Sequence, residues 1–195
     1  MVAAIAAAAA CVVFYTPVWT AGMSLLNAVV HDYTAPGGTN PPWIRVKEEF
    51  LRGFFPLWVD VSDAPPNLQA FTGAYFYPLL LWTIPFDFAK VADVHFVSRI
   101  WLMILGGYLF ARGGLGMGRA GSVMAATAFA FTGIVQKRLT TTEINVLWLL
   151  PVFLLTVGKL ATSARLKWVL LCAALAALAL YSGHPIATFY MLLTG

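Results

Sequence analysis

The sequence predicts an all-α fold, a polytopic transmembrane bundle of about five to six helices with a large extracytoplasmic loop after the first helix. Three observations predict this fold. Hydrophobic residues make up 61% of the 195 residues, charged residues only 10%, and the mean hydropathy is +0.81, values unlike those of a soluble globular domain. The apolar residues come in blocks, and a helix needs about 20 of them to cross a bilayer. A single long polar stretch separates the first block from the rest.

The expected helices follow the apolar blocks. The first is expected over residues 2–28, because the run beginning MVAAIAAAAAC lacks the basic start of a signal peptide and continues beyond its usual length. Later helices are expected over 93–112, 119–136, 144–160 and 167–183. A sixth apolar run starts at Ile186 and reaches only half-way across a bilayer. Residues 1–195 are therefore expected to be a single transmembrane domain, the N-terminal part of a longer protein.

Residues 31–92 form the large polar loop, which has predicted structure of its own. Asn40 precedes two prolines, as at a helix start, and the apolar residues of RVKEEFLRGFF recur at helical spacing. This pattern predicts an interfacial helix near 41–55. Such a helix would either cover the bundle or frame a lipid-facing entrance. The apolar stretch 74–86 is too short to span and contains two prolines, so we expect it to be re-entrant or interfacial.

Charge predicts the orientation. The loops on one side carry only bases, and cytoplasmic loops are enriched in bases. These bases are Arg112, Arg119, Lys159, Arg165 and Lys167. All eight carboxylates are expected on the other side, and they are Asp32, Glu48, Glu49, Asp60, Asp63, Asp87, Asp93 and Glu143. Any chemistry is therefore expected on the acidic, extracytoplasmic face.

Several other functional classes are excluded by the residues. No basic run with interleaved aromatics indicates nucleic-acid binding. Cys11 and Cys172 lie inside apolar segments and lack the spacing of a metal or redox motif. No nucleophile elbow, P-loop, HExxH or dinucleotide fingerprint occurs, and the glycines of GGLGMG (113–118) lie in a cytoplasmic turn.

Five phrases occur in a characteristic order. They are FLRGFFPLW (50–58), GAYFYPLLLWTIP (73–85), ATAFAFTG (126–133), LWLLPVFLL (147–155) and YSGHPIATFYMLL (181–193). In order and spacing, this succession resembles the N-terminal half of bacterial YfhO-type membrane proteins, which look like glycosyltransferases of the GT-C architecture. The resemblance covers about residues 30–193.

This resemblance implies a multi-pass protein of the bacterial inner membrane that transfers a sugar from a polyprenyl-phosphate carrier to an extracytoplasmic acceptor. It also implies an acidic residue just after the first helix, the position of Asp32. Asp32 is therefore the candidate catalytic base, with His31 beside it as a candidate substrate-binding residue. The alternative for Asp32 is a polar helix end at the headgroup level. The expected partners are the lipid-linked sugar, membrane lipid, and a C-terminal continuation or partner subunit, with no nucleic acid.

Two further acids flank a short polar segment of the loop. Asp60 and Asp63 are candidate substrate-binding residues, and the alternative is a solvated loop. With Asp32 they could also hold a divalent cation, because oxygen ligands suit Mg²⁺ or Mn²⁺. The spacing of these acids does not require a metal, so metal dependence stays open.

The remaining candidates lie at the predicted outer ends of helices. Lys137 and Arg138 run against the charge trend and are candidates for the carrier phosphate, beside Glu143 in the same short loop. The alternative for these two bases is interfacial snorkelling. Arg99, near His95, lies within a predicted span and is expected to face a cavity or reach the headgroups. His184 either lines the site or caps a helix end beside Pro185.

Two other functions compete with the transferase. A transporter or flippase is expected to show internal repeats and broken helices, and no repeat is found in the sequence. A non-catalytic membrane subunit would bind a partner through its outer loop and is expected to have no cavity.

Overall fold

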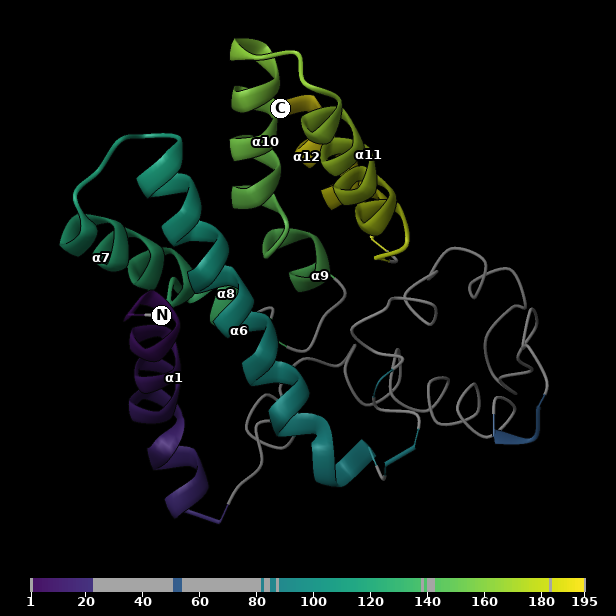
Figure 1. Cartoon of the computed structure of the whole chain (residues 1–195). Coiled ribbons are helices and arrows are strands. Elements are labelled where there is room, and N and C mark those ends of the chain that lie inside the picture. The colour runs from purple at the N-terminus through teal and green to yellow at the C-terminus, as the bar shows by residue number, and fades with distance from the viewer. Residues whose placement is uncertain are drawn as a thin grey trace.

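The computed structural model describes residues 2–22, 51–53, 82, 85, 86, 88–137, 139, 143–182 and 184–194. Every regular element in these residues is a helix, which confirms the all-α prediction for this part of the chain (Figure 1). The helices are α1 (Val2–Thr20), α6 (Phe88–Gly113), α7 (Arg119–Ala130), α8 (Gly133–Lys137), α9 (Ile144–Leu147), α10 (Leu150–Thr162), α11 (Leu166–Leu180) and α12 (Pro185–Thr194). The expected helix near 41–55 and the expected re-entrant segment 74–86 lie almost entirely outside the described residues.

Two described segments are long and apolar enough to cross a membrane, by length and composition alone. They are Asp93–Gly113, with 21 residues, and Ile144–Thr162, with 19 residues. The second comprises α9, a turn at residues 148–149, and α10. The other apolar helices are shorter. The 15 residues of α11, for example, extend about 22 Å against a hydrocarbon core of about 30 Å.

The first helix is shorter than the expected range 2–28, because α1 ends at Thr20. Local contacts explain the end. The helix continues past Pro17, and in its last turn the Thr20 hydroxyl donates to the Thr16 carbonyl at 3.0 Å and so competes for a helical acceptor. Gly22 then adopts a φ of +70°, the left-handed conformation in which helices often end.

The expected helix 119–136 is wrong as a single element. It is broken between Ala130 and Gly133 into α7 and α8. Phe131 leaves the helical region, and the Thr132 hydroxyl donates to the Phe129 carbonyl at 3.0 Å in place of the next helical bond. The side chain of Gln136 donates to the Ala130 carbonyl at 2.9 Å and so stabilises the break.

Three other boundaries differ from the expectation. α6 begins at Phe88 rather than residue 93, so the polar loop 31–92 ends earlier than expected. The expected helix 144–160 is interrupted at residues 148–149, where Pro151 lacks the N–H needed to continue α9 into α10. α11 ends at Leu180 rather than residue 183 because the chain turns at Tyr181 and Ser182 toward α12.

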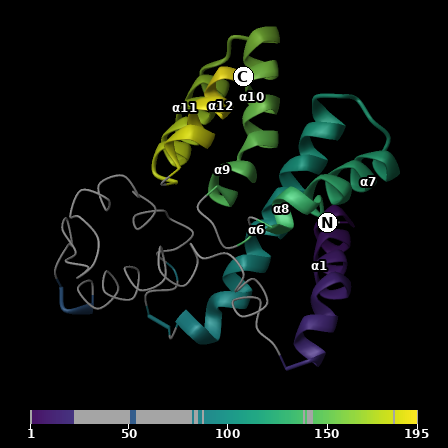
Figure 2. The same ribbon diagram turned by 180° about the vertical axis from the view of Figure 1, so that it is seen from behind.

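The long helix α6 is the centre of the packing. It contacts α1, α7, α9 and α10, while α11 packs on α10 and α12 packs on α9 and α11 (Figures 1 and 2). The buried residues form two clusters, one around α1, α6 and α7 and the other around α10, α11 and α12. Trp148 packs against both clusters, so the turn between α9 and α10 joins the two halves of the core.

The crossing of α6 and α7 depends on Gly107. A Cβ atom at this position would lie 3.1 Å from the Ala126 Cβ and 3.2 Å from the Ala126 Cα. A side chain at Gly107 would therefore push the two helices apart.

Five of the described bases gather at the end of the bundle near the C-terminus of α6, whereas Lys90 and Arg99 lie in its first half and Lys137 ends α8. Toward the C-terminus of α6 lie the turn 113–118 and the turn between α10 and α11 (Figure 1). These turns and the adjoining helical turns hold the five bases of the basic end, which are Arg112, Arg119, Lys159, Arg165 and Lys167. On the other side lie the end of α1, beside the N-terminal half of α6, and the start of α9 and the turn between α11 and α12, which are level with about the middle of α6 (Figures 1 and 2); we call this side the polar end. The described acids, Asp93 and Glu143, lie there.

Candidate functional site

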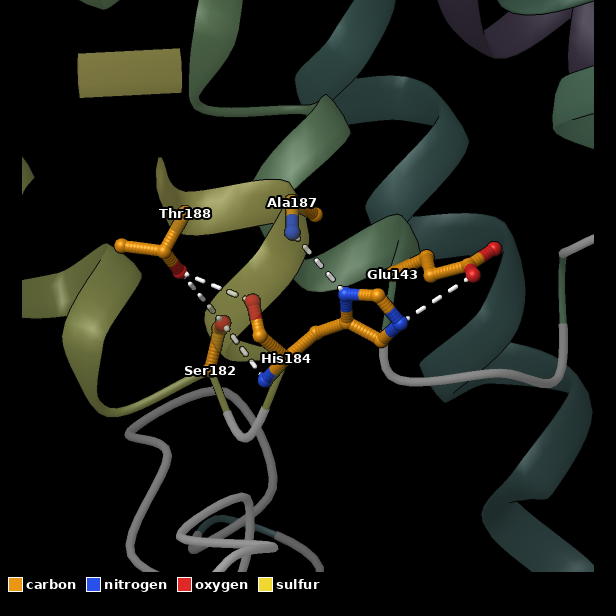
Figure 3. Close-up of polar contacts among 5 residues, drawn as sticks. All are labelled: Glu143, Ser182, His184, Ala187 and Thr188. Atoms are coloured by element: carbon orange, nitrogen blue, oxygen red, sulfur yellow. Dashed lines mark hydrogen bonds and ion pairs between the residues drawn. The ribbon is translucent and has the colours of Figure 1, made fainter. Parts of the chain in front are cut away.

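The polar end holds a hydrogen bond between His184 and Glu143, two candidate residues from different parts of the sequence. His184 Nε2 lies 3.1 Å from Glu143 Oε1, and each side chain is about one quarter exposed (Figure 3). Glu143 stands just before α9, and His184 stands just before α12. The contact therefore connects the starts of α9 and α12, which lie about forty residues apart in the sequence. Pro185 interrupts the apolar run at the start of α12.

The contacts of His184 define the position of its proton. The backbone N–H of Ala187 donates to His184 Nδ1 at 3.1 Å, so Nδ1 carries a lone pair and no hydrogen. The hydrogen of the neutral ring is then on Nε2, which donates to Glu143. Both ring nitrogens are occupied by these two contacts. His184 therefore caps the N-terminus of α12, one of the two roles expected from the sequence, and is not arranged to take a proton from a substrate.

Neighbouring hydroxyl and amide groups hold the same turn. The Thr188 hydroxyl donates to the Ala179 carbonyl at 2.7 Å, and the backbone N–H of His184 donates to Ser182 Oγ at 3.3 Å. From α9, Asn145 Nδ2 donates to the Ser182 carbonyl at 3.2 Å. These three side chains are at least 97% buried, where hydrogen bonding is strongly favoured over unsatisfied polar atoms. The turn between α11 and α12 is thus firmly attached to α9.

A second polar group lies inside α6. Arg99 is only 6% exposed and His95 is fully buried, and a guanidinium nitrogen of Arg99 contacts His95 Nε2. The two residues stand four apart and so share one face of the helix. The guanidinium also lies over the Phe96 ring, 5.5 Å from its centroid. Of the two positions expected for Arg99, facing a cavity or reaching the headgroups, neither is decided by these contacts, which place its guanidinium against His95 and Phe96.

Arg99 reaches the segment that carries the other candidate bases. Its Nη1 donates to the Leu139 carbonyl at 3.4 Å, which lies two residues after Lys137. Lys137 is the last residue of α8, and its side chain is exposed. Arg99 therefore bonds to the chain two residues beyond the end of α8, whose last residue, Lys137, is exposed.

A groove between α1 and α6 opens beside these residues. Its volume is about 440 Å³, and its walls are mostly apolar. The lining residues are Ala8, Cys11, Val12, Trp19, Asp93, Val94, Val97, Ser98 and Trp101. At its polar end, Trp19 Nε1 donates to Asp93 Oδ2 at 3.0 Å. An indole and a carboxylate at the mouth of an apolar groove suit an amphiphilic occupant.

The other predicted site residues cannot be placed. His31, Asp32, Asp60, Asp63 and Arg138 lie outside the described residues. The possible metal set of Asp32, Asp60 and Asp63 is therefore not described either. Within the residues that the structure does describe, no group of three or more His, Cys, Asp and Glu side chains could hold a metal ion.

Sequence reasoning missed four of the polar residues at this end. Asn145, Ser182 and Thr188 form the supporting hydrogen bonds, and Asp93 borders the groove. Asn145 and Thr188 could have been found, because each is a lone polar residue next to apolar ones. The contact of Asp93 with Trp19 could not have been found from sequence, because the two residues are 74 positions apart and no local pattern links them.

Comparison with protein-family models, with curated proteins and with solved structures found no match. The resemblance to YfhO-type proteins therefore stays an expectation from the sequence.

Proposed function

We propose that this chain belongs to a multi-pass membrane glycosyltransferase that uses a polyprenyl-phosphate sugar as donor and acts on an extracytoplasmic acceptor. The bundle would lie in the bacterial inner membrane, with the polar end outside the cytoplasm and the basic end inside. At the basic end the described charges are all bases, and both described acids lie at the polar end, which supports this orientation. The order of the five sequence phrases supports the reaction class.

The observation that carries the proposal is the burial of Arg99. A cation inside an apolar span is costly, so such residues are usually paired and functional. Arg99 bonds to the carbonyl of Leu139, two residues beyond Lys137, the exposed last residue of α8. We assign Arg99 the positioning of the chain just beyond α8, and we assign Lys137 and Arg138 the binding of the carrier phosphate.

The proposed reaction is a substitution at the anomeric carbon. The bond from that carbon to the carrier phosphate breaks, and a bond from the acceptor oxygen forms. Asp32 takes the proton of the acceptor hydroxyl, and the bases neutralise the departing phosphate. Glu143 and His184 hold the site's helices together and take no proton from the acceptor, because both nitrogens of His184 are already engaged.

The groove between α1 and α6 favours this proposal over a non-catalytic subunit. A subunit that only binds a partner through its outer loop needs no cavity, whereas a lipid-linked substrate needs an apolar wall for its chain. The groove supplies about 440 Å³, and Trp19 and Asp93 form its polar mouth.

Donor binding tests the proposal. The chain in nanodiscs is titrated with a labelled polyprenyl-phosphate sugar, and Lys137→Gln is compared with Lys167→Gln, which removes an exposed lysine from the basic end. Loss of one exposed phosphate contact is worth about 1 kcal/mol, so Lys137→Gln should weaken binding about fivefold. Lys167→Gln should leave it unchanged. Equal effects of both variants, or no donor binding by the parent, would contradict the proposal.

A further inference from the structure

The basic end holds a second groove, bounded by three helices. It lies between α6, α7 and α10 and has a volume of about 230 Å³. The lining is almost wholly apolar and consists of Gly107, Phe110, Ala111, Leu115, Ala125, Ala126, Phe129, Leu150, Pro151 and Leu154. Small-molecule pockets typically measure about 300–1,000 Å³, so this groove suits part of a chain rather than a whole ligand.

Each of the three helices leads from this groove to a base. Arg112 directly follows the lining residue Ala111 on α6. Arg119 begins α7, six residues or about 9 Å before Ala125, and Lys159 follows Leu154 on α10 by five residues or about 7.5 Å. The side chain of Arg112 is held over the turn, because its Nη1 donates to the Met117 carbonyl at 2.7 Å.

The charge of this end is of one sign among the described residues. The described acids, Asp93 and Glu143, both lie at the polar end. An apolar groove with bases beyond one end is complementary to an amphiphile with an anionic head. Basic pockets between membrane helices on the cytoplasmic side bind such headgroups.

We propose that the groove between α6, α7 and α10 binds one acyl chain of an anionic phospholipid, whose headgroup contacts Arg112, Arg119 and Lys159. This site is distinct from the proposed donor site at the opposite end. It rests on the membrane placement proposed above and is independent of sugar transfer.

Lipid retention tests the headgroup part of this site. The chain is released from nanodiscs of equal dioleoyl phosphatidylglycerol and dioleoyl phosphatidylcholine, and retained lipids are counted by native mass spectrometry. The parent should retain phosphatidylglycerol in at least fivefold excess. The double variant Arg119→Gln/Lys159→Gln should lose this excess, since each base near the surface contributes about fivefold. Arg112 is left intact because of its bond to the turn.

The matched control removes two bases from the same end but away from the groove. Arg165→Gln/Lys167→Gln lies at the start of α11, which does not line the groove, so it should keep the excess. Equal retention of the two lipids by the parent would overturn the proposal. Equal losses in both double variants would also overturn it, because they would show a general charge effect.

A second pair of variants tests the acyl-chain part. Ala125→Leu fills the groove, whereas Ala128→Leu adds the same atoms to an exposed position of α7. Circular dichroism confirms that both variants keep the parent's helical content. Only Ala125→Leu should lower phosphatidylglycerol retention, and unchanged retention in this variant would remove the groove from the site.

Discussion

The contact of His184 with Glu143 makes a quantitative prediction about stability. His184→Ala removes the acceptor that caps α12 and the donor to Glu143. Loss of an N-cap costs about 1 kcal/mol. The hydrogen bond from His184 Nε2 to Glu143 joins side chains that are about one quarter exposed, so its loss costs about 0.5–1 kcal/mol. Together, His184→Ala should lower the free energy of unfolding by about 1.5–2 kcal/mol.

A second substitution separates the two contributions. His184→Asn keeps a side-chain oxygen that can accept from the first turn of α12, but asparagine is too short to reach Glu143. His184→Asn should therefore lose only the stability contributed by the contact with Glu143. A double-mutant cycle of His184→Asn with Glu143→Ala should give a coupling energy of about 0.5–1 kcal/mol.

The assay is reversible unfolding in mixed micelles, followed by circular dichroism. Thr194→Ala, which removes an exposed hydroxyl bond at the far end of α12, is the control and should change stability by less than about 0.5 kcal/mol. A coupling energy within about 0.2 kcal/mol of zero would refute the interaction between Glu143 and His184. If His184→Asn lost the full amount of about 1.5–2 kcal/mol, the effect of His184→Ala, the separation of the cap's contribution from that of the Glu143 contact would be refuted.

Three further predictions follow from the packing and the charges. Gly107→Val should destabilise the fold by about 2 kcal/mol, because the new side chain meets the backbone of Ala126. Gly133→Ala, at a position with open space around it, should not destabilise the fold, and thermal unfolding of the two variants measures the difference. Arg99→Met should cost about 1–3 kcal/mol by leaving buried polar groups near His95 and Leu139 unsatisfied, and an unfolding energy equal to that of the parent would contradict this. In a chain whose two cysteines are replaced by alanine, a membrane-impermeant maleimide added outside intact cells should label Thr132→Cys and not Leu115→Cys, and the reverse pattern would invert the orientation.

Local pattern predicted the helices well and their interruptions poorly. Apolar runs predicted α6 and α11 with boundaries within about five residues, and predicted α9 and α10 as one helix over 144–160. The break between α7 and α8 was missed, because ATAFAFTGIV is apolar throughout and the interruption depends on side-chain bonds from Thr132 and Gln136. The early end of α1 depends on the side-chain bond of Thr20 and on the backbone of Gly22, which hydropathy alone does not weigh.

For the candidate site, local pattern likewise predicted the residues better than the contacts they make. Arg99, Glu143 and His184 were found from sequence because charges and histidines stand out against apolar segments. Their partners depend on tertiary packing. Sequence could place Glu143 and His184 at the same end, but only the packing of α12 on α9 brings their side chains to 3.1 Å. The grooves on either side of α6 depend on helix crossings that no periodicity encodes.

The proposed sugar transfer is tested most directly by turnover. The chain in nanodiscs is given a labelled polyprenyl-phosphate sugar, and release of the free carrier phosphate is measured for the parent and for Asp32→Asn. Our account predicts turnover by the parent that disappears in Asp32→Asn while donor binding persists. Turnover that survives in Asp32→Asn would contradict the assignment of the base, and a parent that neither binds nor turns over the donor would contradict the transferase itself.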